Sequence, residues 1–136
     1  MPSVDPFDFA FAFGGDPQDL TITLSGAVDA AGLKRLNDAL VADPQFRAGM
    51  AILVDVTALD TSRLDEDELF TGVGPVVERD ATSPPRAVAI VVSDDETFAK
   101  AVHYRAHLGG SSSRRRIFTD RSEALAWLEA QRDAAV

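Results

Sequence analysis

Two histidines are the first candidates for chemistry, because His103 and His107 lie four residues apart in the stretch DDETFAKAVHYRAHLGG. That spacing puts both imidazoles on one face of a helix, where they could bind a metal ion. A metal site needs a third ligand, and Lys100, which we expect to pair with Glu96 on a solvated flank, puts a positive charge there instead. We therefore predict no metal site, and we consider His103 and Tyr104 as residues that line a pocket.

Three consecutive arginines, at positions 114–116, follow the loop GGSSS. Alternate residues of a strand point to opposite faces, so Arg114 and Arg116 share one side and Arg115 opposes them. Charge on an edge strand prevents aggregation, and this explains the run without any ligand. The alternative is that Arg114, Arg116 and the loop form an anion site for a lipid headgroup or an acidic partner surface.

Other reaction types find little support in the residues. The chain has no cysteine, which excludes disulfides, thiolate metal sites and a cysteine nucleophile. No G-x-S-x-G elbow follows a strand, and no glycine-rich loop with a lysine opens a helix to hold phosphate. Among the 22 acidic residues no spacing isolates a catalytic pair. We predict no cofactor.

The elements that must position these residues begin with two strands. FDFAFAF, residues 7–13, alternates phenylalanine with Asp or Ala, which is the two-residue period of a strand. The turn residues GGDPQ lead to DLTITLSG, residues 19–26, which alternates again, so we predict a hairpin. A helix follows, with Asp29 as its N-cap and Pro44 as its stop.

The remaining chain alternates buried strands with helices. The predicted strands are MAILVDV (50–56), AVAIVVS (87–93) and RRRIFT (114–119), and the predicted helices are residues 64–80, 94–110 and the segment from Asp120 onwards. In the helix over 94–110, the residues expected to face inward are Phe98, Ala101, Val102 and Leu108. This order predicts one α/β domain over residues 1–136. We expect a mixed sheet of about five strands, with an N-terminal hairpin and helices on both faces.

The charge is unevenly divided along the chain. Residues 1–80 contain 15 acidic and 5 basic residues, whereas residues 81–136 contain 7 acidic and 8 basic residues. A net charge of −9 repels nucleic acids at long range, so we expect no nucleic-acid partner. No basic leader precedes an apolar run, and no apolar stretch approaches the ~18 residues of a membrane span. We expect a cytoplasmic protein without a transmembrane segment.

Several segments resemble one known family. RIFTDRSEALAWL, AVAIVVS and LTITLSGAVDAAGL are similar to the SpoIIAA-like family, small bacterial proteins related to STAS domains. The resemblance extends from Leu20 to Leu128, and its most specific part, FTDRSEALAWL, is a strand end, a helix cap and a core tryptophan. The family also resembles the CRAL-TRIO lipid-carrying fold, which implies a small hydrophobic ligand or a lipid.

The same resemblance points to Ser62. In the related anti-sigma factor antagonists a kinase phosphorylates a serine of a D-S-S-G motif, and LDTSRLDEDEL places Ser62 at that position, with Arg63 in place of the glycine. The four acids at positions 65–68 would repel a phosphate at the helix start. We therefore expect that Ser62 or Thr61 simply caps the helix.

Taken together, the residues and the resemblance predict a non-enzymatic binding or regulatory module for a small hydrophobic or lipid ligand or a protein partner. The residues considered for ligand binding are Arg114, Arg116, His103 and Tyr104. Two alternatives stay open: an antagonist-like protein that is switched by phosphorylation of Ser62, and an enzyme that uses His103 and Tyr104 with nearby carboxylates. The sequence also leaves a homodimer open.

Overall fold

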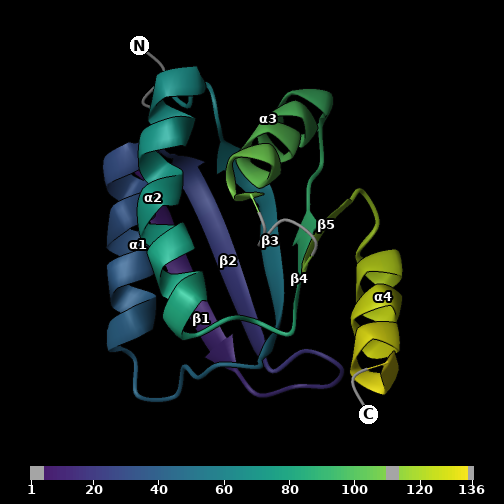
Figure 1. Ribbon diagram of the computed structural model, residues 1–136. Coiled ribbons are helices and arrows are strands. Elements are labelled where there is room, and N and C mark those ends of the chain that lie inside the picture. The colour runs from purple at the N-terminus through teal and green to yellow at the C-terminus, as the bar shows by residue number, and fades with distance from the viewer. Residues whose placement is uncertain (1–4, 110–113, 135–136) are drawn as a thin grey trace.

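The computed structural model describes residues 5–109 and 114–134. Along this part of the chain the elements are β1 (Asp8–Phe13), β2 (Leu20–Ala27), α1 (Ala30–Ala42), β3 (Ala51–Asp60), α2 (Glu66–Thr82), β4 (Ala87–Val91), α3 (Asp95–His107), β5 (Arg115–Phe118) and α4 (Arg121–Ala134) (Figure 1). No helix in these described ranges is long and apolar enough to cross a membrane.

The five strands form one sheet in the order β1-β2-β3-β4-β5. β1 runs antiparallel to β2, with Phe9 opposite Leu24, and every other neighbouring pair is parallel. A helix connects each pair of parallel neighbours, as crossover connections require. The predicted α/β fold is confirmed: a five-stranded mixed sheet that begins with a hairpin.

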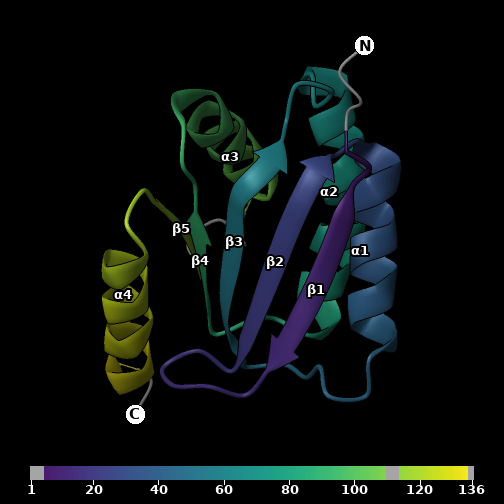
Figure 2. The same cartoon turned by 180° about the vertical axis from the view of Figure 1, so that it is seen from behind.

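The helices divide unequally between the two faces of the sheet. α1, α2 and α3 cover one face, and α4 covers the other face near β3, β4 and β5 (Figures 1 and 2). Strand residues under the three helices are mostly large and apolar: Ile22, Leu24, Ile52, Val56, Val88 and Ile90. Those under α4 include the small residues Ala51, Ala87 and Ala89. Small side chains let α4 pack closely, whereas the three-helix layer encloses more space.

α4 packs on the sheet through fully buried Ala124 and Leu128. Trp127 is half-buried, and its ring lies 5.8 Å from the ring of Phe118 at the end of β5. Asp120 accepts hydrogen bonds from the backbone N–H groups of the first helical turn, as the sequence predicts. The tryptophan therefore belongs to the contact between α4 and β5.

Aspartates cap the three helices on the other face. Asp29 accepts from the N–H of Gly32 in α1, and Asp94 does the same for Thr97 in α3. In α2 the cap is Asp65, whose carboxylate accepts from the N–H of Glu68 at 2.9 Å. The prediction that Ser62 or Thr61 caps this helix is wrong. A carboxylate directly before the first turn takes that place, because it also complements the helix dipole.

The inward face of α3 also differs from the expectation. Phe98 and Val102 are 39% and 45% exposed, and the prediction that they face inward is wrong. Thr97 and Ala101 are buried instead, and Tyr104 packs against the core. The helix is turned so that polar side chains reach the interior, which is favourable only where the interior offers them space or partners.

Candidate functional site

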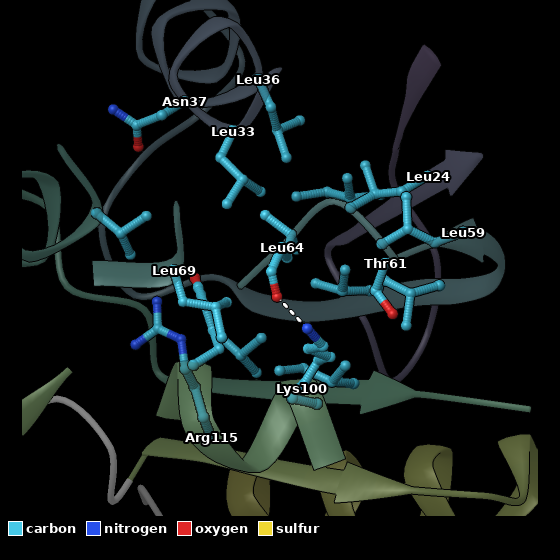
Figure 3. A pocket seen from close by; sticks show the side chains of 18 of the residues that line it. Leu24, Leu33, Leu36, Asn37, Leu59, Thr61, Leu64, Leu69, Lys100 and Arg115 are labelled. Carbon is cyan, nitrogen blue, oxygen red and sulfur yellow. Dashed lines mark hydrogen bonds between the residues drawn. The ribbon is translucent and has the colours of Figure 1, made fainter. Parts of the chain in front are cut away.

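A cavity of ≈ 130 Å³ lies between the sheet and the layer formed by α1, α2 and α3. Most of its wall is aliphatic, supplied by Leu and Val of the helices and by the large residues of β2, β3 and β4. Figure 3 shows Leu33 and Leu36 pointing from α1 into this space, with Lys100 and Arg115 on the opposite side. The polar lining residues are Asn37, Thr61, Arg79, Thr97, Lys100, Tyr104 and Arg115.

Close approach of α1 and α2 shapes one wall of the cavity. A Cβ atom built on Gly72 would lie 2.6 Å from Cδ1 of Leu33, so only a glycine lets α2 pack here without moving that side chain. Leu33 is thereby held along the cavity wall. A side chain at position 72 would therefore require the end of Leu33 to shift along the cavity wall.

Lys100 extends from α3 across the cavity wall. Its Nζ donates a hydrogen bond to the backbone carbonyl oxygen of Leu64, in the loop between β3 and α2 (Figure 3). The expectation that Lys100 lies on a solvated flank with Glu96 is therefore wrong. The long aliphatic stem runs along apolar surface while the ammonium reaches a carbonyl, a common arrangement for partly buried lysines.

Two arginines and one aspartate form a buried polar cluster beside the cavity. Nη1 of Arg115 lies 2.7 Å from Oδ2 of Asp80, and its Nη2 lies 3.4 Å from Oδ1, so the guanidinium and the carboxylate meet in parallel. Nη1 of Arg79 donates to the amide oxygen of Asn37 at 2.7 Å, and its Nε lies 3.9 Å from Asp80. Arg79 also stacks on the ring of Phe46 at 5.9 Å.

Burial affects the two arginines of this cluster differently. Burial lowers the pKa of Arg79, the charge of Arg115 lowers it further, and Tyr104 and Asp80 only partly oppose this. Burial also acts against the charge of Arg115. Tyr104 and the hydrogen bonds to Asp80 outweigh it and raise the pKa of Arg115. The surroundings of Arg115 therefore compensate well for the burial of its positive charge, and those of Arg79 compensate less.

The structure separates the two residues considered as pocket-lining. Tyr104 lines the cavity, whereas His103 is exposed on the surface of α3, with its Nδ1 3.5 Å from Oε2 of Glu66. His107 approaches the other oxygen of Glu66 at 3.2 Å. Among the described residues, no group of three His, Cys, Asp or Glu side chains could hold a metal ion. The histidine pair thus belongs to a surface contact between α2 and α3.

The three arginines also separate. Arg114 and Arg116 are exposed, and the guanidinium of Arg116 lies over the ring of Phe118 at 5.5 Å. The loop residues 110–113, predicted as part of their anion site, lie outside the described residues. Arg115 pairs in register with Val88, on the face under the three helices, and reaches the cavity. Sequence reasoning missed Arg115, because alternation alone does not say which face of a strand is covered.

Ser62 and Thr61 have opposite environments. Ser62 is exposed in the turn before α2, where its N–H donates to Oδ1 of Asp60 at 2.9 Å. This backbone bond, with a second from the Ser62 side chain, lowers the pKa of Asp60. Thr61 is buried and lines the cavity. Of the two hydroxyls, only that of Ser62 is accessible to a kinase.

Comparison with known proteins identifies the fold. No family model and no curated protein matches the chain. Among solved structures it is similar to an uncharacterized protein of the DUF3478 family from Shewanella loihica PV-4, with a TM-score of 0.59 over 94% of this chain and 99% of that chain. That crystal structure is described as having a SpoIIAA-like fold. The chain has a SpoIIAA-like fold. At 16% identity the likeness concerns the SpoIIAA-like fold alone, so function rests on the cavity.

Proposed function

We propose that this SpoIIAA-like protein binds a small apolar ligand in the cavity between its sheet and α1, α2 and α3. The observation that carries the proposal is the cavity itself, whose volume of ≈ 130 Å³ is lined mainly by aliphatic side chains. An apolar cavity of ~150 Å³ is known to accept benzene. The expected ligand part is therefore the size of an aromatic ring or a short alkyl chain.

The size of this space supports binding over simple imperfect packing. Protein interiors are normally close-packed and contain few voids larger than a water molecule. A space of ≈ 130 Å³ with a mainly aliphatic wall is large enough for an apolar ring.

The other readings of the sequence fit the geometry less well. An enzyme that uses His103 and Tyr104 needs both side chains at one site, and only Tyr104 reaches the cavity. Ser62 is accessible and adjoins Thr61, which lines the cavity, so phosphorylation would act next to the ligand site. A regulatory role is thus compatible with ligand binding, and a small-ligand module is the function supported best.

Native mass spectrometry of the purified protein, with the same sample after denaturation, tests this function. We expect a small mass that departs on unfolding or, if the protein purifies empty, saturable binding of benzene and hexan-1-ol in calorimetric titrations. An empty protein that binds neither probe would contradict the proposal.

A pair of alanine variants on α3 localises the binding. Ala101 is buried and lines the cavity, whereas Ala106 is exposed on the same helix. Ala101→Leu should fill the cavity and abolish probe binding while the protein stays folded. Ala106→Leu should bind as the wild type does. If both variants lose probe binding equally, or if neither loses it, the probe binds outside this cavity.

A further inference from the structure

We infer that the ligand carries a carboxylate that is received by Arg79 and Arg115, which makes it a small monocarboxylic acid with an aromatic or short alkyl body. This inference rests on the proposed function, because it assumes that the cavity binds a ligand. It follows from the charges of the wall, from the partners of Arg79 and from the volume of the cavity.

The charge of the cavity wall has the opposite sign to that of the protein. Arg79, Lys100 and Arg115 line the cavity, and none of the described lining residues is an aspartate or glutamate. Asp80 lies beside the two arginines and contributes one carboxylate. The chain has a net charge of −9, yet these positive charges are held at an apolar cavity rather than on its surface. An anion inside the cavity would balance them.

Asp80 balances one of the two arginines. Its short, two-point contact is with Arg115, at 2.7 and 3.4 Å, whereas it lies 3.9 Å from Arg79. The close partner of Arg79 is the amide oxygen of Asn37, which is neutral and does not balance a charge. A guanidinium held out of water gains from a close negative charge, and the nearest carboxylate oxygen to Arg79 is the one of Asp80 at 3.9 Å. A further negative charge beside Arg79 is therefore favoured.

Tyr104 completes a receptor for an oxyanion. Tyr104 lines the same cavity, and its side chain is hydrogen-bonded to Arg115. A phenol can donate its proton to a carboxylate oxygen while the guanidinium groups supply parallel N–H donors. Bound there, a carboxylate would also favour the charged form of Arg79, whose pKa is lowered mainly by burial and to a lesser extent by the charge of Arg115.

Volume and charge together decide the class of acid. The Arg79–Asp80–Arg115 cluster carries one surplus positive charge, which matches a monoanion received at this cluster. Lys100, the third cation of the wall, is hydrogen-bonded to the carbonyl oxygen of Leu64 instead. The space of ≈ 130 Å³ accommodates a benzene-sized body, and a full lipid chain would have to extend beyond it. Short-chain acids and long-chain fatty acids carry the same carboxylate. A comparison of ligands with different chain lengths therefore shows which of the two kinds of acid the cavity binds.

Calorimetric titration with hexanoate, hexan-1-ol and hexylamine, which share one chain, tests the inference. We expect hexanoate to bind at least ten-fold more tightly than the alcohol, and the amine to bind more weakly still. Equal binding of acid and alcohol would overturn the carboxylate assignment and leave the proposed function intact. If none of the three binds, the proposed function itself fails. Hexadecanoate should bind no more tightly than hexanoate, and tighter binding would contradict the assignment to a small acid.

Variants of Arg79 identify the receiving group without breaking the buried ion pair. Arg79→Gln removes the surplus charge and leaves Arg115 with Asp80, so hexanoate affinity should fall at least ten-fold while hexan-1-ol affinity falls much less. Arg79→Lys keeps the positive charge and should retain part of the preference for hexanoate over hexan-1-ol. The matched control is Arg116→Gln, because Arg116 is exposed and lies on the opposite face of the strand from Arg115. This variant should bind hexanoate as the wild type does. A preference that survives Arg79→Gln or is lost in Arg116→Gln would overturn the inference.

Discussion

Arg115 and Asp80 form an ion pair inside the protein, with Nη1 and Oδ2 2.7 Å apart and side chains that are 2% and 1% exposed. The two residues are 35 positions apart in sequence, and their contact joins the edge strand β5 to the last turns of α2. Arg115 lines the cavity, and its contact with Asp80 holds the guanidinium in place at the wall. It therefore links the stability of the fold to the chemistry of the proposed site.

The first prediction concerns this ion pair. Asp80→Asn leaves the Arg115 charge buried without its carboxylate and should lower the free energy of unfolding by about 3–5 kcal/mol. The double variant Asp80→Leu with Arg115→Met removes both charges and should lose much less. Urea unfolding measures both. A single variant that is as stable as the double variant would show that the pair contributes little.

The second prediction concerns Trp127. The side chain is half-buried against Phe118, so Trp127→Ala should cost less than the ~3–5 kcal/mol of a fully enclosed aromatic residue, about 2 kcal/mol. Trp127→Phe keeps a ring in the contact and should lose less than half of that. Thermal and urea unfolding report the difference. A change in Trp127→Ala below about 0.5 kcal/mol would mean that α4 docks without this residue.

The third prediction concerns the exposed arginines. Replacing Arg114 and Arg116 by glutamine should leave the free energy of unfolding within about 0.5 kcal/mol of the wild type, because neither is buried. If the two form a surface anion site, that site is weak and is lost as salt rises, since exposed charges are screened over ~8–10 Å near physiological ionic strength. Sulfate titration at low and high salt checks this. Salt-independent sulfate binding that needs Arg114 would contradict it.

The fourth prediction concerns phosphorylation. Ser62 is exposed and Thr61 is buried, so a kinase that acts on this turn should modify Ser62 alone. Incubation with ATP and an extract of the host cell, followed by mapping of phosphate by mass spectrometry, tests this. Ser62→Ala should remove the signal, and Thr61→Val should keep it. Phosphate on another residue, or none at all, would rule out control through Ser62.

Much of the fold follows from local patterns in the sequence. Strict alternation over residues 7–13 predicts β1, and the apolar runs at 50–56 and 87–93 predict β3 and β4. Asp29 and Asp120 are recognisable as helix starts because a capping carboxylate acts on its own first turn. Such signals need no knowledge of the tertiary structure, and each of them is confirmed.

The candidate site is less accessible from sequence, because its contacts are not local. Alternation separates Arg115 from its neighbours but does not reveal that its face lies under three helices. Its partner Asp80 is one acid among 22 and has no distinguishing spacing. On α3, Phe98 and Val102 are predicted to face inward because they are apolar, but both are exposed. Tyr104 faces inward instead and lines the cavity. Polar residues beside a cavity break the pattern on which sequence reasoning depends.

Methyl NMR of the protein titrated with hexanoate is the most direct test of binding in the cavity. Saturable chemical-shift changes should appear at the methyl groups of Leu33, Leu36 and Leu64, which line the cavity, with intermolecular contacts to the hexanoate chain. Val41, 56% exposed on α1, should not respond. Unchanged cavity methyls at millimolar hexanoate, or changes confined to exposed residues such as Val41, would contradict a ligand site between the sheet and α1, α2 and α3.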